Sequence, residues 1–117
     1  MAAVVSDTAL YAVQQNSPVQ LAIEIGDEQV GGTSILWQGQ IREIPGNGGD
    51  RFGSKGEDLR HQILHCVTTV RDINKQTNRT SVTYTLSGGQ ATQRFPYTVE
   101  VPKEGEYAQY TIDFIFI

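Results

Sequence analysis

Hydrophobic and polar residues alternate with a period of two along most of the chain. From Val19 to Ile25 every second residue is valine, leucine or isoleucine, and the residues between them are polar or small. The same alternation returns in residues 82–86 and 95–101. A period of two places the apolar residues on one face of a β-strand and the polar residues on the other. These segments are therefore predicted strands with one buried face.

Turn-forming residues separate the predicted strands. Gly31-Gly32 is expected to divide residues 21–26 from 34–44, and the polar segment 74–79 to join 61–73 and 80–86 as an antiparallel hairpin. A last strand is predicted at 107–117, and 9–15 is predicted as a short helix or a first strand.

This pattern predicts a single all-β domain spanning residues 1–117. We expect an antiparallel β-sandwich of about 7–9 strands, because several short alternating segments with regular turns are typical of that architecture. Alternation does not give strand order, so Ig-like, C2-like and jelly-roll topologies all stay open.

Two segments are apolar on both faces. In residues 110–117, Phe114 and Phe116 share one parity, while Ile115 and Ile117 share the other; residues 61–70 behave similarly. A strand that is apolar on both faces needs cover on both. We therefore expect Ile115 and Ile117 to project from an outer face and the protein to self-associate through its C-terminal strand. The alternative is that the N-terminal segment 2–13 folds across that face.

The segment Gly46–Gly56 is rich in glycine, with five of the chain's 12 glycines. Glycine disfavours strands and helices, so the segment is predicted to be a long loop, and such loops often carry binding sites. An exposed Phe52 between the cations Arg51 and Lys55 would suit a glycan, a small anion or a protein ligand. The predicted ligand-binding residues, which include two polar neighbours, are Asn47, Asp50, Arg51, Phe52 and Lys55.

Charge and composition exclude several other classes of protein. The net charge is −4 and the cations are scattered, which argues against nucleic acid and against an anionic membrane surface. No apolar run approaches the roughly 20 residues of a membrane span, and the first residues lack the features of a signal peptide, so we expect a cytoplasmic protein. Cys66 is the only cysteine and is expected to be a packed thiol.

No catalytic constellation or metal site emerges from the sequence. His61 and His65 would stand roughly 13 Å apart on a strand, too far to share a metal. Asp50, Glu57 and Asp58 alternate with cations, which makes a poor calcium site. No serine lies in a nucleophile elbow, and Trp37 is expected in the core rather than as a platform for a sugar ring. We therefore expect no cofactor and no metal.

The leading functional hypothesis is a non-catalytic recognition module that uses residues 46–56 as its contact surface. Two alternatives stay open. One is a structural subunit of a larger assembly. The other is a hydrolase-type enzyme with scattered acid and base residues, drawn from Glu43, Asp50, Glu57, His61 and His65.

Overall fold

The structure is a computed structural model and describes residues 3–53 and 55–117. Within these residues the chain forms nine strands and one short 3-10 turn, η1 (Gly56–Asp58). The strands, in chain order, are β1 (Ala3–Tyr11), β2 (Val19–Ile25), β3 (Val30–Trp37), β4 (Gln40–Pro45), β5 (Gly48–Phe52), β6 (Ile63–Arg71), β7 (Arg79–Ser87), β8 (Gln93–Glu100) and β9 (Tyr107–Phe116).

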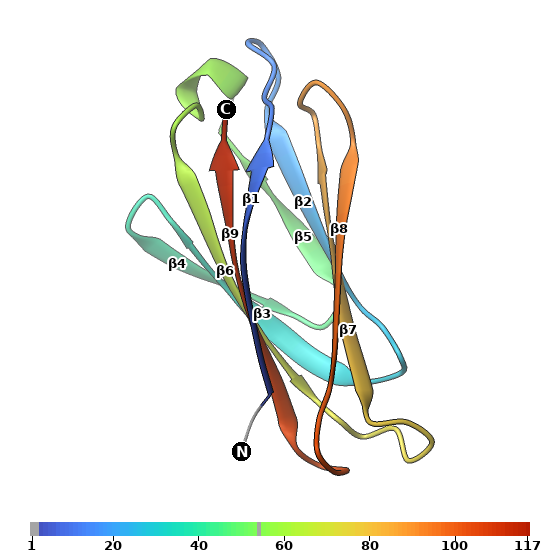
Figure 1. Ribbon diagram of the computed structural model, residues 1–117. Helices are drawn as coiled ribbons and strands as arrows, with labels where there is room; N and C mark the ends of the chain where they lie inside the picture. The colour runs from blue at the N-terminus through green and yellow to red at the C-terminus, as the bar shows by residue number, and fades with distance from the viewer. Residues whose placement is uncertain (1–2, 54) are drawn as a thin grey trace.

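The strands form two sheets that pack face to face (Figure 1). The five-stranded sheet has the order β1-β9-β6-β3-β4, and the four-stranded sheet has the order β5-β2-β7-β8. The predicted all-β sandwich is thus confirmed. All pairings are antiparallel except that of β1 with β9, which is parallel.

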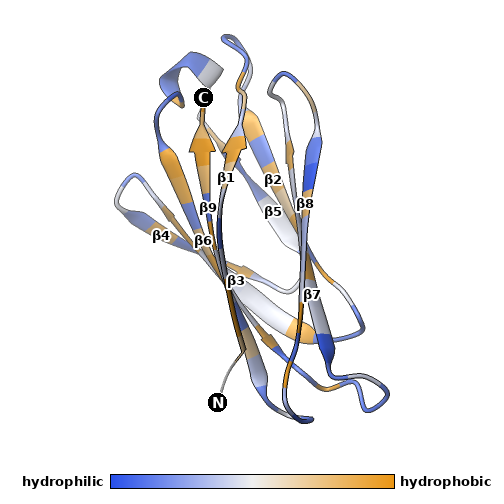
Figure 2. Cartoon of the chain, in the orientation of Figure 1, coloured by the Kyte–Doolittle hydropathy of each residue, from blue (hydrophilic) through white to orange (hydrophobic). Residues whose placement is uncertain are grey.

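The core lies between the two sheets. One parity of each central strand is buried, as in Val19, Leu21 and Ile23 of β2, and Figure 2 shows hydrophobic residues concentrated in β2, β6 and β9 while most turns are hydrophilic. Trp37 is 5% exposed and packs edge-on against the rings of Phe52 and Phe116. Its predicted place in the core is confirmed, because it contributes a large apolar surface to the packing of both sheets.

Buried hydroxyl groups connect the two sheets across the core. Thr68 of β6 hydrogen-bonds Thr33 of β3 at 2.8 Å and the Tyr84 hydroxyl of β7 at 2.5 Å. Thr80 of β7 hydrogen-bonds the Tyr110 hydroxyl of β9 at 2.6 Å. These partners satisfy polar atoms that would otherwise be costly to bury. Burial raises the pKa of Tyr84 above its ordinary value.

The position of β1 overturns one expectation about the N-terminal segment. β1 pairs edge to edge with β9, from Ala3 opposite Ala108 to Tyr11 opposite Phe116. It therefore extends the five-stranded sheet instead of crossing its outer face. Of the two alternatives for residues 9–15, a short helix or a first strand, the strand is observed where β1 covers residues 9–11. Because β6 pairs with the other edge of β9, the last strand is internal.

One predicted turn lies elsewhere, and a further turn divides one predicted strand. Gly31-Gly32 falls within β3, and the chain turns instead at Asp27 and Glu28, which both have positive φ. At Gly31 an added Cβ would stand 2.3 Å from the Thr69 carbonyl oxygen of β6, so this glycine permits close strand pairing. A second turn at Gln38-Gly39 divides the predicted strand 34–44 into β3 and β4.

The predicted hairpin between 61–73 and 80–86 is also wrong. β6 and β7 belong to different sheets, and residues 72–78 carry the chain from one sheet to the other. Both strands bury one apolar face, and these faces oppose each other across the core instead of sharing a sheet. The seven connecting residues can span the roughly 10 Å between packed sheets.

Candidate functional site: the outer face of the five-stranded sheet

The glycine-rich segment 46–56 does not form the long loop expected from its composition. Residues Gly48–Phe52 are strand β5, which pairs with β2. At Gly49 an added Cβ would stand 2.2 Å from the Leu21 carbonyl oxygen, so glycine is required where the two backbones meet. The composition that disfavours an isolated strand here serves close strand pairing.

Gly56, at the end of that segment, lies against the connection between β1 and β2; Ser54 is outside the described residues. Gly56 is buried, and an added Cβ there would stand 1.8 Å from the Gln14 carbonyl oxygen. The Glu57 backbone N–H donates to the Gln15 carbonyl at 3.3 Å. These contacts hold Gly56 and Glu57 against residues 14–15.

The predicted ligand residues lie in separate environments. Phe52, expected to be exposed, is 1% exposed and packs against Trp37, with ring centroids 5.4 Å apart. Asn47 Oδ1 accepts a hydrogen bond from the Ile25 N–H at 2.8 Å. Asp50 accepts one from Arg42 at 2.5 Å. Arg51 and Lys55 are exposed, but the aromatic ring expected between them is in the core.

The residues considered for hydrolysis are likewise dispersed. Glu43 on β4 accepts a hydrogen bond from Ser34 at 2.8 Å. His61 lies in a turn with positive φ, whereas His65 lies on β6 and contacts Asp113 of β9. Glu57 belongs to η1. Among the described residues, no group of three or more histidine, cysteine or acidic side chains is placed to hold a metal ion, and no pocket is present.

The thiol of Cys66 is fully buried, as its apolar neighbours predicted. Burial raises the pKa of the Cys66 thiol to about 12, with a smaller contribution from the negative charge of Asp113. A thiol with this pKa stays protonated at neutral pH and is a weak nucleophile.

The feature that stands out is the outer face of the five-stranded sheet. Strand register aligns Leu10, Ile115 and Ile63 in one row across β1, β9 and β6. The next row contains Leu36 of β3 opposite Ile41 of β4. Ile117 follows Ile115 on the same side of the chain. We call these six residues the outer-face patch: Leu10, Leu36, Ile41, Ile63, Ile115 and Ile117.

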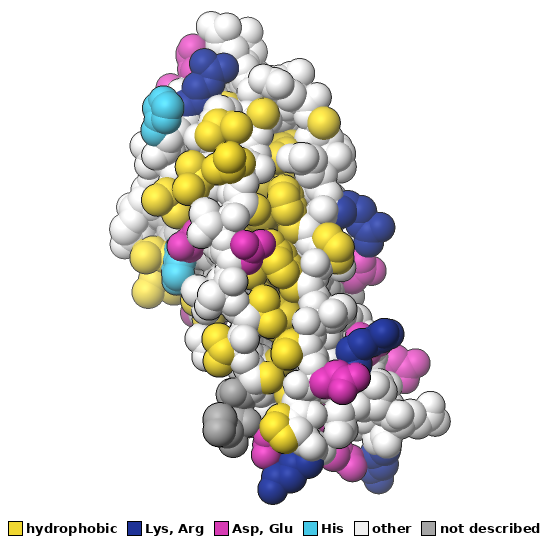
Figure 3. Space-filling view, viewed as in Figure 1, with side chains coloured by type: hydrophobic (Ala, Val, Ile, Leu, Met, Phe, Trp, Pro, Cys, Tyr) yellow, Lys and Arg dark blue, Asp and Glu magenta, His cyan; other side chains and the backbone are white. Residues whose placement is uncertain are grey.

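Most of this patch is accessible to solvent. Leu10 is 56% exposed, Ile63 is 53% exposed and Ile41 is 70% exposed. Figure 3 shows hydrophobic side chains gathered over the upper ends of β6, β9 and β1. Contiguous exposed aliphatic side chains on a rigid sheet are typical of a protein-binding surface.

The polar groups beside the patch are largely paired with one another. His65 contacts Asp113 in the same row as Leu36 and Ile41, and Ser34 donates to Glu43. These pairs come from neighbouring strands, and the cross-strand register brings them together. The outer face therefore presents aliphatic surface with internally compensated polar groups.

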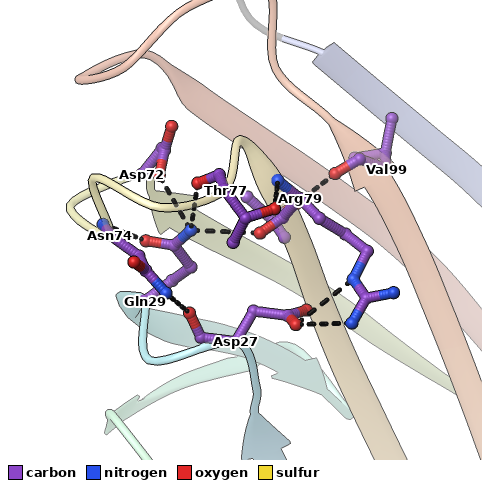
Figure 4. Close-up of polar contacts among 8 residues, drawn as sticks. Asp27, Gln29, Asp72, Asn74, Thr77, Arg79 and Val99 are labelled. Atoms are coloured by element: carbon purple, nitrogen blue, oxygen red, sulfur yellow. Dashed lines mark hydrogen bonds and ion pairs between the residues drawn. The ribbon is translucent and has the colours of Figure 1, made fainter.

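A second polar cluster lies at the far end of the sandwich and has a structural role (Figure 4). The Gln29 side chain accepts hydrogen bonds from the Ile73 and Asn74 N–H groups at 2.7 and 2.9 Å. It donates to Asp72 Oδ1 at 2.8 Å and to the Arg79 carbonyl at 3.0 Å. This buried amide therefore fastens the start of β3 to the crossing segment 72–78.

Asp27 completes this cluster through an ion pair. Arg79 donates to Asp27 Oδ1 at 2.8 Å, and this hydrogen bond holds the pKa of the Asp27 carboxyl below its ordinary value. Both side chains are thereby occupied in joining the turn after β2 to the start of β7.

Sequence reasoning identified part of the outer-face patch and missed the rest. Ile115 and Ile117 were expected on the outer face, and Ile63 had the opposite parity to Leu64. Leu10 and Ile41 carried no such signal, because their strands are otherwise mixed in polarity. Asp113 could not be matched to His65 without the register of β6 and β9.

Comparison of the chain with protein-family models found no match, and comparisons with curated proteins and with solved structures found no significant similarity. None of the helical segments in the described residues is long and apolar enough to span a bilayer.

Proposed function

We propose that the protein is a non-catalytic protein-binding module that associates with a second copy of itself through the outer-face patch. The observation that carries the proposal is the aliphatic row Leu10–Ile115–Ile63, in which Leu10 and Ile63 are exposed, extended by the exposed Leu36 and Ile41 in the neighbouring row. Two such faces would pack as stacked sheets do elsewhere in β proteins.

The size and charge of the face suit a second copy. Five strands about 4.8 Å apart and four rows along each strand cover roughly 600 Å², or about 1,200 Å² for two copies, at the lower end of specific interfaces. Asp113 contacts His65 and Glu43 accepts hydrogen bonds from Ser34, so both carboxylates on this face have polar partners within the same copy. A twofold axis also covers both copies with one surface.

The recognition surface first expected at residues 46–56 is less well supported, because Phe52 is buried and Asp50 is paired with Arg42. The hydrolase alternative gains no support from residues that lie on separate elements. We also propose a cytoplasmic location, which suits a chain whose single cysteine is free and buried.

Sedimentation of matched lysine variants tests the proposal. Ile63→Lys introduces a charge into the patch, and Ile73→Lys introduces one at a similarly exposed isoleucine outside it, since the two are 53% and 48% exposed. We expect the wild type and Ile73→Lys to sediment as dimers and Ile63→Lys as a folded monomer. A wild type that stays monomeric at millimolar concentration would overturn the proposal.

A further inference from the structure

The sandwich has four open sheet edges, at β1 and β4 of the five-stranded sheet and at β5 and β8 of the four-stranded sheet. An open edge presents backbone N–H and C=O groups with which another strand can pair. Proteins commonly block such edges with proline, glycine, short strands or charges. The four edges of this molecule are not blocked equally.

Proline interrupts two of the edges. In β8 the chain continues to Val101, whose N–H donates to Asn78 on the β7 side. Successive residues of a strand turn their backbone groups to opposite sides. Pro96 precedes Val101 by an odd number of residues, so its backbone faces the open edge, where it lacks an N–H. In the same way, the Gly46 N–H donates to the Gly31 carbonyl of β3. The preceding residue, Pro45, therefore turns its backbone toward the open edge of β4.

The β5 edge is blocked differently, because that strand has only five residues and begins with two glycines. β1, by contrast, has nine residues and contains neither proline nor glycine. It is the longest open edge without such an interruption among the described strands.

The direction of the free backbone groups of β1 follows from its contact with β9. The Tyr11 carbonyl accepts a hydrogen bond from the Ile117 N–H at 2.9 Å, so residues of the same parity as Tyr11 pair with β9. The residues of the other parity turn both backbone groups toward the open edge. These residues are Val4, Ser6, Thr8 and Leu10.

A strip of apolar side chains follows the same edge on the inner side. Phe95, Tyr97 and Val99 of β8 are only partly buried, because the β1 residues facing them include the small Ala3 and Ala9. Figure 3 shows this strip as a line of hydrophobic side chains between β1 and β8. A strand added to β1 would direct alternate side chains over the strip.

Asp7 lies in the middle of β1 and decides which strand fits. It is exposed, faces the strip and accepts a hydrogen bond from the Tyr97 hydroxyl at 2.8 Å. In antiparallel pairing of two β1 edges over their whole length, Asp7 would oppose Asp7 of the other copy, and directly opposed like charges are destabilising. A partner with a cation at that position would be favoured.

We propose that the open edge of β1 binds an extended segment of a partner protein by strand addition, with a lysine or arginine opposite Asp7. Backbone hydrogen bonds to Val4, Ser6, Thr8 and Leu10 would supply affinity, as in other cases of strand addition. Apolar side chains flanking the cation would cover Phe95 and Val99. This site is separate from the outer-face patch and does not depend on dimerisation there.

The test uses the peptide Val-Thr-Val-Thr-Lys-Thr-Val-Thr-Val and a control peptide with aspartate in place of lysine. We expect fluorescence anisotropy to show at least about tenfold tighter binding of the lysine peptide, equivalent to about 1.4 kcal/mol. The order should reverse for Asp7→Lys. Binding should also slow amide exchange of Ser6 and Thr8, whose N–H groups face the open edge, more than that of Val5.

Ser6→Pro removes one N–H from the open edge while leaving the β9 side of β1 free to pair. We expect it to weaken peptide binding at least about tenfold with the sandwich intact, and Thr8→Pro provides the same test if Ser6→Pro does not fold. Absence of lysine-peptide binding at millimolar concentration would overturn the proposal. So would binding that is unchanged in a folded proline variant.

Discussion

The two outer faces of the sandwich differ in chemistry although the same chain builds both. The four-stranded sheet presents Ala22, Glu24, Thr83 and Thr85, which are typical of a surface in water. The five-stranded sheet presents Leu10, Ile63 and other residues of the outer-face patch at positions of the same kind. Because the central strands of both sheets already bury an inner face, folding alone does not require aliphatic residues on one outer face. The difference points to a contact made after folding.

The largest expected effect comes from adjacent residues on opposite faces of β9. Phe114 is fully buried, whereas Ile115 lies on the outer face. Phe114→Ala should lower the free energy of unfolding by about 3–5 kcal/mol through loss of buried area and creation of a cavity. Ile115→Ala should lower it by about 1 kcal/mol or less in the monomer. Urea unfolding at low protein concentration measures both, and equal losses would contradict the distinction between the faces.

A smaller loss of stability is expected from a change in the polar cluster around Gln29. Gln29→Ala removes the side chain that accepts from Ile73 and Asn74, leaving two backbone N–H groups without that partner. We expect a loss of about 2–3 kcal/mol in the free energy of unfolding. Gln20→Ala, on the exposed face of β2, is the control and should change it by less than about 0.5 kcal/mol. If the Gln29 variant matches this control, the network contributes little to stability.

Alkaline pH should lower the free energy of unfolding, by at most about 1.4 kcal/mol per pH unit for each buried acid. The Cys66 thiol ionises near 9 when unfolded and near 12 when folded. Between these values the unfolded chain loses a proton that the native protein keeps, so stability falls as pH rises. Urea unfolding at pH 7, 9 and 10 should show this decline, and Cys66→Ala should flatten it. If stability falls with pH as steeply in the variant as in the wild type, the thiol is not the source of the decline.

The smallest effect on stability should come from making the outer face of the four-stranded sheet aliphatic, like the outer face of the five-stranded sheet. Thr83→Ile with Thr85→Ile places two aliphatic side chains on the outer side of β7, and exposed changes of this kind usually alter stability by less than about 0.5 kcal/mol. We expect a new, weak self-association, detectable by sedimentation of this double variant in the Ile63→Lys background. The Ile63→Lys protein without these changes is the control. No gain in association would mean that aliphatic content alone does not create the contact.

The sequence predicted the sandwich well because alternation reports burial directly. Leu21 and Ile23 are buried while Gln20 and Glu24 are exposed, as their parity required. Which strands pair with one another was harder to predict, since the hairpin expected between residues 61–73 and 80–86 is a crossing between sheets. Parity specifies which face of a strand is buried but not which strand lies beside it.

The candidate site could be predicted only in part for a related reason. The glycines in residues 46–56 were interpreted as evidence for a long loop, whereas Gly49 and Gly56 are places where another backbone comes very close. Composition alone cannot distinguish a glycine in a loop from a glycine at a close backbone contact. Binding of an anion by Arg51 and Lys55 stays a prediction. Ile115 and Ile117 could be assigned to an outer face because both parities of their strand were apolar.

The parallel pairing of β1 with β9 has a consequence for the order of folding. β9 lies between β1 and β6, so the five-stranded sheet has a gap until residues 107–116 are in place. The first strand is then joined to the sheet only through contacts separated by more than 100 residues in the sequence, from Ala3 opposite Ala108 onward. Such non-local contacts slow folding, because the entropy of closing a long loop is lost before the contacts form. A nascent chain on the ribosome would hold β1 unpaired until synthesis reached β9.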